Sequence, residues 1–184
     1  DSTGGNFVMD VSGCIVTNMT FDREEVPQYA VTVLAADYGS PPKSTTGILT
    51  VIVLDANDNS PIMESSFYTA TVSEIIPIGT SILRVNATDM DNGTNALVSY
   101  SIVEDTAAAF FVVNKSSGVL HAANLSLYEQ QHFYQFHILA QDGGVPPLNA
   151  TALIHIFSTD YNVHPPVFGQ SSYSAELREN LAPG

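Results

Sequence analysis

The chain has 184 residues, of which 45% are hydrophobic and 13% charged, so it can bury the core of one large domain or two small ones and is not disordered throughout. Its 19 Asp and Glu residues outnumber its 5 Lys and Arg residues and give a formal charge of -14. This charge excludes nucleic acids and anionic membranes as electrostatic partners and favours cations or neutral surfaces.

No segment predicts a membrane span or a secretion signal. The longest apolar runs, such as residues 48–54, are interrupted by Thr and are too short to cross a bilayer. The first residues lack the Met, the basic region and the apolar stretch of a signal peptide. We therefore expect the sequence to be part of a longer chain.

The chain contains an internal repeat with an offset of 105 positions. Identical residues at this offset include Glu24 and Glu129, Tyr29 and Tyr134, Asp37 and Asp142, Asp55 and Asp160, and Glu74 and Glu179. An offset of this size exceeds the roughly 20 to 50 residues of a solenoid repeat and indicates consecutive whole domains. We expect residues 1–60 to be the C-terminal part of a domain that ends in its linker, residues 61–168 to be a complete domain, and residues 169–184 to be the first strand of another.

The pattern along the complete domain predicts strands. Apolar residues alternate with polar ones in segments such as 134–140, and turn signals at 91–93, 116–118 and 143–147 separate the segments. No segment combines helix caps with apolar residues spaced three and four apart. The composition therefore predicts an all-β antiparallel β-sandwich. Cys14 matches the strand position Val119 at the repeat offset, which predicts a buried or half-buried thiol.

Acidic residues gather beside turn residues at the ends of the predicted strands, in segments 22–24, 55–59 and 89–95. Clustered hard oxygen ligands suit calcium, although each cluster alone is also consistent with an ordinary turn. The segment from Asp89 is not an EF-hand loop, because Thr94 replaces the Gly of the sharp turn and Tyr100 replaces the closing Glu. The five His residues lack metal-binding spacing, and no catalytic motif is present.

Together and in this order, the motifs resemble the extracellular cadherin repeat. Its signatures are an early Glu, an Asp-Arg-Glu, an Asp-x-Asn-Asp-Asn linker, an Asp-x-Asp-x-Gly-x-Asn and an Asp before a late turn. The resemblance covers essentially the whole chain and is to long cadherins of the Fat, Dachsous or protocadherin kind. It implies tandem seven-stranded Greek-key β-sandwich domains of the immunoglobulin-like type, stacked end to end, with up to three calcium ions (Ca2+) at each junction.

Carried over residue by residue, the resemblance implies a full set of calcium ligands at the first junction. These ligands are Asp22, Glu24, Asp55, the Ala56 carbonyl, Asn57, Asp58, the Asn59 carbonyl, Asp89, Asp91, the Asn95 carbonyl and Asp142. Asp37 and Glu179 would belong to junctions outside this sequence.

The second junction departs from the family pattern. Glu74, Glu129, Asp160 and Asn162 take the expected positions, but Leu127 replaces one Asp, and Val163 and His164 replace the inner Asp-Asn of the linker. We therefore expect this junction to bind less calcium and to be bent or flexible. The alternative is that fewer ligands plus water hold the same ions. His164 could also tune this joint by protonation, although a chance substitution is the simpler explanation.

The resemblance implies an extracellular, calcium-dependent cell-adhesion segment of a membrane-anchored, single-pass plasma-membrane protein, and no enzymatic activity. The partner would be another cadherin ectodomain, homophilic or heterophilic. A non-adhesive structural spacer or mechanical tether in a receptor ectodomain remains the alternative, and a calcium-assisted enzyme is a distant third. Six glycosylation sequons support secretion: Asn18, Asn86, Asn92, Asn114, Asn124 and Asn149. The sequence has no Trp, which excludes the Trp-dependent arm exchange of classical cadherins from these residues.

Overall fold

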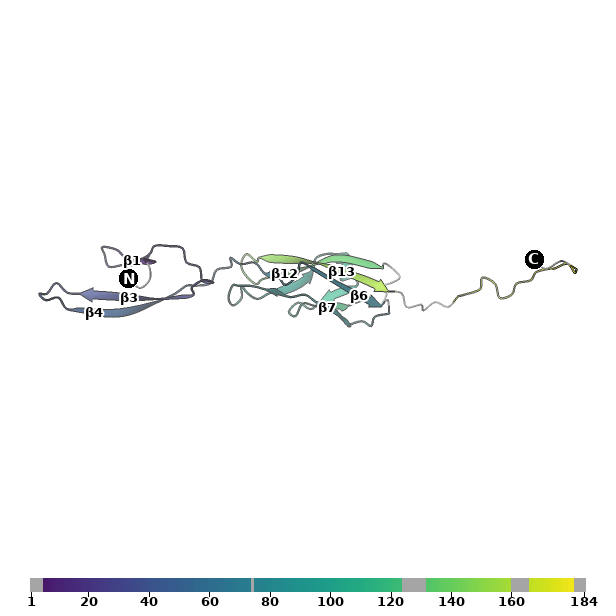
Figure 1. Ribbon diagram of the computed structural model, residues 1–184, viewed down its shortest axis with the longest axis horizontal. Coiled ribbons are helices and arrows are strands. Elements are labelled where there is room, and N and C mark those ends of the chain that lie inside the picture. Colours follow the sequence, from purple (N-terminus) through teal and green to yellow (C-terminus); the bar gives the residue numbers. More distant parts are fainter. Residues whose placement is uncertain (1–4, 74, 124–131, 160–165, 181–184) are drawn as a thin grey trace.

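The computed structural model describes residues 5–73, 75–123, 132–159 and 166–180. An N-terminal unit (residues 5–60), a β-sandwich that runs from Ile62 to Thr159 and that we call the complete domain, and a C-terminal segment (residues 166–180) follow one another along the long axis of the molecule (Figure 1). Within the described part of the chain, no helix is long and apolar enough to span a membrane.

The complete domain is a β-sandwich of a four-stranded and a three-stranded sheet, which confirms the predicted fold class. The first sheet has the order β6 (Phe67–Ser73), β13 (Asn149–Thr159), β12 (Phe133–Gln141) and β9 (Ser99–Ile102). The second has the order β10 (Phe111–Val113), β11 (Val119–Ala122) and β7 (Ser81–Arg84). A separate short pair is formed by β5 (Ile62–Met63), which precedes β6 in the chain, and β8 (Ala87–Thr88), which follows β7. Strands β6 and β13 run parallel, and the other paired strands run antiparallel.

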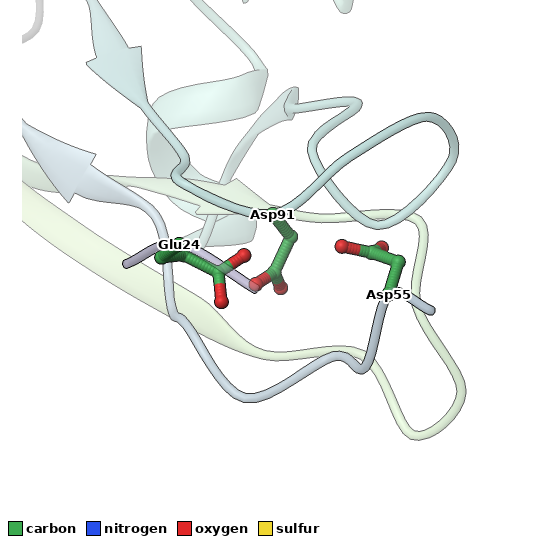
Figure 2. Close-up of side chains that lie close together, drawn as sticks. All are labelled: Glu24, Asp55 and Asp91. Carbon is green, nitrogen blue, oxygen red and sulfur yellow. The ribbon is translucent and has the colours of Figure 1, made fainter. Parts of the chain in front are cut away.

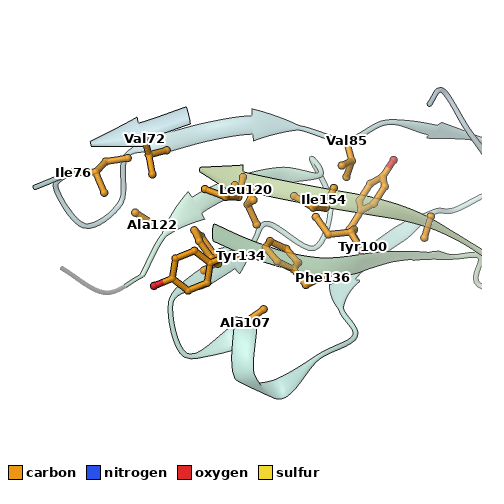
Figure 3. Packing of buried hydrophobic residues seen from close by; sticks show 14 residues of the cluster. Val72, Ile76, Val85, Tyr100, Ala107, Leu120, Ala122, Tyr134, Phe136 and Ile154 are labelled. Carbon is orange, nitrogen blue, oxygen red and sulfur yellow. The ribbon is translucent and has the colours of Figure 1, made fainter. Parts of the chain in front are cut away.

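The core lies between the two sheets, where the period of two in the sequence places apolar side chains on one face (Figure 3). On β12, Phe136 and Ile138 are fully buried, while their neighbours Gln135 and His137 retain solvent exposure. The ring of Phe136 stacks on that of Phe111 from the opposite sheet, with centroids 5.2 Å apart. Each such side chain stabilises the domain by about 1.5–3 kcal/mol through burial alone.

One short helix was not predicted. Helix α1 (Asp105–Ala108) is a single turn after β9, and its first carbonyl, that of Glu104, accepts the amides of Ala107 and Ala108. Four residues are too few to produce the three-and-four spacing that marks a helix in a sequence.

The N-terminal unit repeats part of the same architecture. Strands β1 (Phe7–Met9) and β2 (Ile15–Thr17) form one antiparallel pair, and β3 (Gln28–Ala36) and β4 (Ser44–Ile52) form another. Both ends of β3 lie 105 residues before the ends of β12, and a cis peptide bond precedes Pro41 as it precedes Pro146. The structure thus confirms the repeat offset.

The N-terminal unit buries few apolar side chains. Phe7 and Val31 are buried, whereas Leu34, Ile48 and Ile52 on β3 and β4 are exposed, because within the described residues the only sheet that packs against this pair is the short pair β1–β2, through the contact of Phe7 with Tyr29. The prediction for Cys14 is wrong: the residue lies in the turn just before β2, and its thiol is exposed and accepts a hydrogen bond from the Ser12 hydroxyl at 3.3 Å.

Residues 166–180 contain turns and bends but no strand. A strand requires a ladder of hydrogen bonds to a neighbour, and no described strand lies alongside this segment. The strand expected over residues 169–184 stays a prediction.

Candidate metal centre

Four segments meet where the N-terminal unit joins the complete domain: the turn before β3, the linker after β4, the loop after β8 and the loop between β12 and β13. Local hydrogen bonds shape each one. In the first, Asp22 Oδ1 accepts the amides of Glu24 and Glu25, at 2.8 and 3.2 Å. In the third, Asp89 Oδ1 accepts the amide of Asp91 at 3.0 Å. These Asx turns hold the loops in tight bends that expose other acidic side chains to the junction.

Three carboxylates from three different segments form the first acidic cluster, which we call the linker group: Glu24, Asp55 and Asp91 (Figure 2). One oxygen of each lies within 4.8 Å of the others. Asp55 is held in place by the complete domain, because its Oδ1 accepts the amide of Asn92 at 3.0 Å and its Oδ2 accepts the Asn95 side-chain amide at 2.8 Å. The linker group therefore joins the N-terminal unit, the linker and the complete domain.

The second cluster, which we call the loop group, consists of Asp89, Asp91 and Asp142, and their oxygens also approach within 4.8 Å. Asp91 and Asp142 are only 7% and 5% exposed. Each of the three carboxylates has a buried Oδ2 that has no hydrogen-bond partner. Because Asp91 belongs to both groups, the two candidate cation positions are adjacent.

The backbone orients Asp142 within the loop group. Its Oδ1 accepts the amides of Gly144 and Leu148, both at 3.0 Å, which leaves Oδ2 to face the other carboxylates. Gly144 also makes room for the linker, since a Cβ there would overlap the side-chain amide of Asn57. Asn57 in turn donates to the Pro146 carbonyl at 2.8 Å, and its buried Oδ1 has no partner.

The electrostatics of the loop group are unfavourable without a cation. Burial raises the pKa of Asp89, as do the charges of Asp91 and Asp142, and these effects outweigh the hydrogen bond from the Asp91 amide. Two carboxylates about 4 Å apart repel by roughly 4 kcal/mol at an effective dielectric constant near 20. A hard divalent cation with oxygen ligands would remove this repulsion and satisfy the unpaired oxygens, and calcium takes six to eight such ligands.

Some of the ligands predicted for this junction are not part of either carboxylate group, and their role in binding calcium stays a prediction. Asp22 and Asp58 are exposed and belong to neither group; Asp22 caps its turn, and Asp58 accepts the Asn59 side-chain amide. That amide also donates to Asp91 Oδ1 at 2.8 Å, so Asn59, like Asn95, contacts the site through its side chain. Ala56 uses its carbonyl to accept the amide of Asp58.

Arg23 is part of the site, although its role there was not predicted from the sequence. Its guanidinium pairs with Glu24 and Asp55 and donates to the Met90 carbonyl. Its place between two predicted ligands was the available signal, but a motif does not show where a long cationic side chain points.

The remaining predicted metal ligands fall outside this centre. Asp37 repeats the geometry of Asp142, because its Oδ1 accepts the amides of Lys43 and Gly39, and these bonds lower the pKa of Asp37. Glu179 is exposed in a turn. Glu74, Glu129, Asp160 and Asn162 of the second junction, together with Leu127, Val163 and His164, lie outside the described residues. Among the described residues, no potential metal cluster includes His or Cys.

Five of the six sequons lie in the described segments. Asn18, Asn92, Asn114 and Asn149 are exposed, Asn86 is half-buried, and Asn124 lies outside the described residues.

Comparisons with known proteins agree with this architecture. The family model of the cadherin domain matches residues 1–54 and 68–157. The chain is 35% identical over 168 residues to protein dachsous of Drosophila melanogaster, an alignment that covers 90% of this chain and 5% of dachsous. It is 37% identical over 182 residues to protocadherin Fat 1 of Homo sapiens, covering 98% of this chain and 4% of that protein. The solved cis-dimer structure of protocadherin gammaB7 EC3-6 matches with a TM-score of 0.79 and 34% identity, covering 92% of this chain and 42% of that one. The chain thus spans a small part of the length of the two relatives compared by sequence.

Proposed function

Because the chain belongs to the cadherin family, we propose that it is a segment of a calcium-dependent cell-adhesion ectodomain whose junction between repeats is stiffened by bound calcium. Cadherin ectodomain repeats are extracellular adhesion modules and not enzymes, in line with the prediction from the sequence. We further propose that the parent protein is anchored in the plasma membrane by a single span.

One observation carries the proposal: the loop group presents three buried carboxylate oxygens that no hydrogen bond satisfies. A buried, unpaired carboxylate oxygen costs free energy, and a cation offsets that cost when several such oxygens converge. Asp89, Asp91 and Asp142 would hold one ion, with Glu24 and Asp55 joining Asp91 around a second.

The ligands also explain how binding would stiffen the chain. Glu24 comes from the N-terminal unit, Asp55 from the linker and Asp91 from the complete domain. Repulsion among these carboxylates, which the pairing of Arg23 with Glu24 and Asp55 offsets only in part, favours separation of the two units, and calcium supplies the positive charge that reverses this preference. The carboxylates then hold the N-terminal unit and the complete domain in one orientation.

We propose another cadherin ectodomain as the partner, homophilic or heterophilic. The match to a protocadherin structure described as a cis-dimer supports this choice. For the second junction we retain the proposal of a calcium-poor, flexible joint, which follows from Leu127 and Val163 in the sequence.

Calorimetric titration of calcium into the full chain tests the proposed site. We expect binding in the range of about 10⁻⁴ to 10⁻³ M that extracellular calcium modules show. Asp142→Asn should weaken binding by at least about tenfold, because it removes charge from a buried ligand. Asp105→Asn, which removes one exposed carboxylate outside both groups, is the matched control and should bind like the wild type. Equal binding by both variants, or no binding by the wild type at about 10 mM calcium, would contradict the proposal.

A further inference from the structure

The guanidinium of Arg23 lies against the same carboxylates that form the linker group. It pairs with Glu24, and its Nε lies 2.5 Å from Asp55 Oδ1, in an ion pair without hydrogen-bond geometry. The three side chains are only 18%, 12% and 20% exposed, so water screens these pairs less than it screens pairs on an open surface. Among the described residues, Arg23 is the only Lys or Arg that forms an ion pair.

Arg23 also crosses from one repeat to the next. Its NH2 group donates to the backbone carbonyl of Met90 at 2.9 Å, 67 positions along the chain, in the loop between Asp89 and Asp91. This one side chain therefore contacts the N-terminal unit, the linker and the complete domain. These are the same three segments that the linker group joins.

The charge of the guanidinium opposes metal binding at the linker group. Arg is always protonated in proteins, so it offers a permanent positive charge to Glu24 and Asp55. A cation that binds these oxygens must displace the guanidinium or bind beside it. Either process weakens the net attraction between the cation and the two carboxylates. Within the described residues, no Lys or Arg pairs with the loop group.

We propose that Arg23 is a built-in competitor of calcium, which clamps the junction at low calcium and lowers the calcium affinity of the linker group. The proposal rests on the proposed calcium function. It predicts two classes of binding, in which the loop group fills first and the linker group fills as Arg23 gives up its contacts.

The first test is calorimetric titration of calcium into the full chain and its Arg23→Gln variant. We expect the weaker class of sites to gain affinity by about two- to tenfold, the range given by removal of one or two partly exposed ion pairs. Arg84→Gln is the matched control. It removes the same charge from the complete domain, where Arg84 donates to the Ser117 carbonyl and pairs with no described carboxylate.

The second test needs no calcium. Cys14, the sole cysteine, is exposed and accepts a spin label, and Thr106→Cys places a second label on α1 of the complete domain. In EGTA, Arg23→Gln should broaden the distance distribution between the labels, and Arg84→Gln should leave it unchanged.

The outcomes separate this inference from the proposed function. Unchanged or weaker calcium binding by Arg23→Gln, with the wild type binding normally, would overturn the competitor role alone. An unchanged distance distribution in EGTA would overturn the clamp. A wild type that binds no calcium would overturn the proposed function and, with it, the competitor role.

Discussion

Asp91 is the residue on which the candidate centre depends most, because its carboxylate is shared by the linker group and the loop group. It is 7% exposed, its Oδ1 accepts the Asn59 amide, and its Oδ2 has no partner. Asp22 differs although the sequence motif assigns it the same role. Its Oδ1 is engaged by two amides of its own turn.

We therefore expect neutralisation of Asp91 to weaken calcium binding more than neutralisation of Asp22, although each substitution removes one negative charge. Asp91→Asn should weaken calcium binding by more than about tenfold, since it removes charge from both groups. Asp22→Asn keeps an oxygen that caps the turn, so we expect a loss of less than about threefold. Calorimetry on the full chain measures both. Equal losses would return Asp22 to the ligand set.

Glu104 provides a test of pH dependence away from the metal centre. Its Oε2 accepts the backbone amide of His137 and its Oε1 contacts His137 Nδ1, both at 2.7 Å. Burial by itself would raise the pKa of Glu104, but the hydrogen bonds and charge of His137 outweigh it and lower the pKa from its ordinary value of 4.5. A carboxyl group whose pKa is lowered by folding stabilises the native state at pH values above its ordinary pKa. This stability is lost as the pH falls through the lowered pKa.

We therefore expect Glu104→Gln to reduce the stability of the domain near neutral pH and to have a smaller effect as the pH falls below 4.5. Thermal unfolding followed by circular dichroism between about pH 3 and 7, in EGTA, measures the difference between wild type and variant. If the difference in stability between wild type and variant stayed constant with pH, the contact between Glu104 and His137 would not be the source of a pH-dependent stabilisation.

Among the elements, β12 shows how one strand serves both the core and the site. Its alternate side chains fill the sandwich, and the strand ends at Gln141, one residue before Asp142. The packing of the strand therefore fixes the position of a candidate ligand. The loops position candidate ligands in a different way. A turn orients Asp89, and the backbone at Gly144 lies close to the linker residue Asn57.

Phe136→Ala should destabilise the complete domain by about 3–5 kcal/mol, because it leaves a cavity beside Phe111. Val112→Ala on β10, where the side chain is 52% exposed, should change stability by less than about 0.5 kcal/mol. Urea unfolding followed by circular dichroism suits a chain without Trp. A loss below about 1 kcal/mol for Phe136→Ala would contradict the packing described above.

Gly144→Ala should affect the junction more than the domain. The added Cβ would collide with the Asn57 side chain, so the linker must shift and the hydrogen bond to Pro146 is lost. We expect calcium affinity to fall by about tenfold or more, because loss of a group that supports metal ligands typically costs about 10- to 100-fold in metal affinity. Gly47→Ala on β4, where a Cβ meets nothing within 4 Å, is the control and should bind calcium normally.

The whole chain combines a net charge of -14 with an end-to-end arrangement of the N-terminal unit and the complete domain. Negative charge gathers at the narrow junction between the N-terminal unit and the complete domain, where Glu24, Asp55, Asp89, Asp91 and Asp142 converge. The orientation of these units should therefore respond to divalent cations more strongly than the fold of either one.

Removal of calcium should broaden the shape distribution of the chain without unfolding the complete domain. Small-angle X-ray scattering in EGTA should report a wider range of interdomain arrangements than in about 2 mM calcium, while circular dichroism stays nearly constant. Magnesium at the same concentration should have little effect, because it requires a small octahedral site and releases water reluctantly. Identical scattering in EGTA and calcium would exclude calcium-dependent stiffening of this junction.

The repeat offset, the β-sandwich and the acidic composition of the junction could be predicted from the amino-acid sequence alone. These features are local or periodic: alternation of apolar residues specifies strands, and Asp, Asn and Gly specify tight acidic turns. Only the three-dimensional arrangement of the segments shows which carboxylate oxygens lie within 4.8 Å of one another, and that Asp22 Oδ1 accepts an amide of its own turn. It also decided that Cys14 is exposed and that Arg23 reaches the Met90 carbonyl. The physical reason is that convergence, burial and the direction of a long side chain depend on the packing of segments far apart in the chain, which no local pattern records.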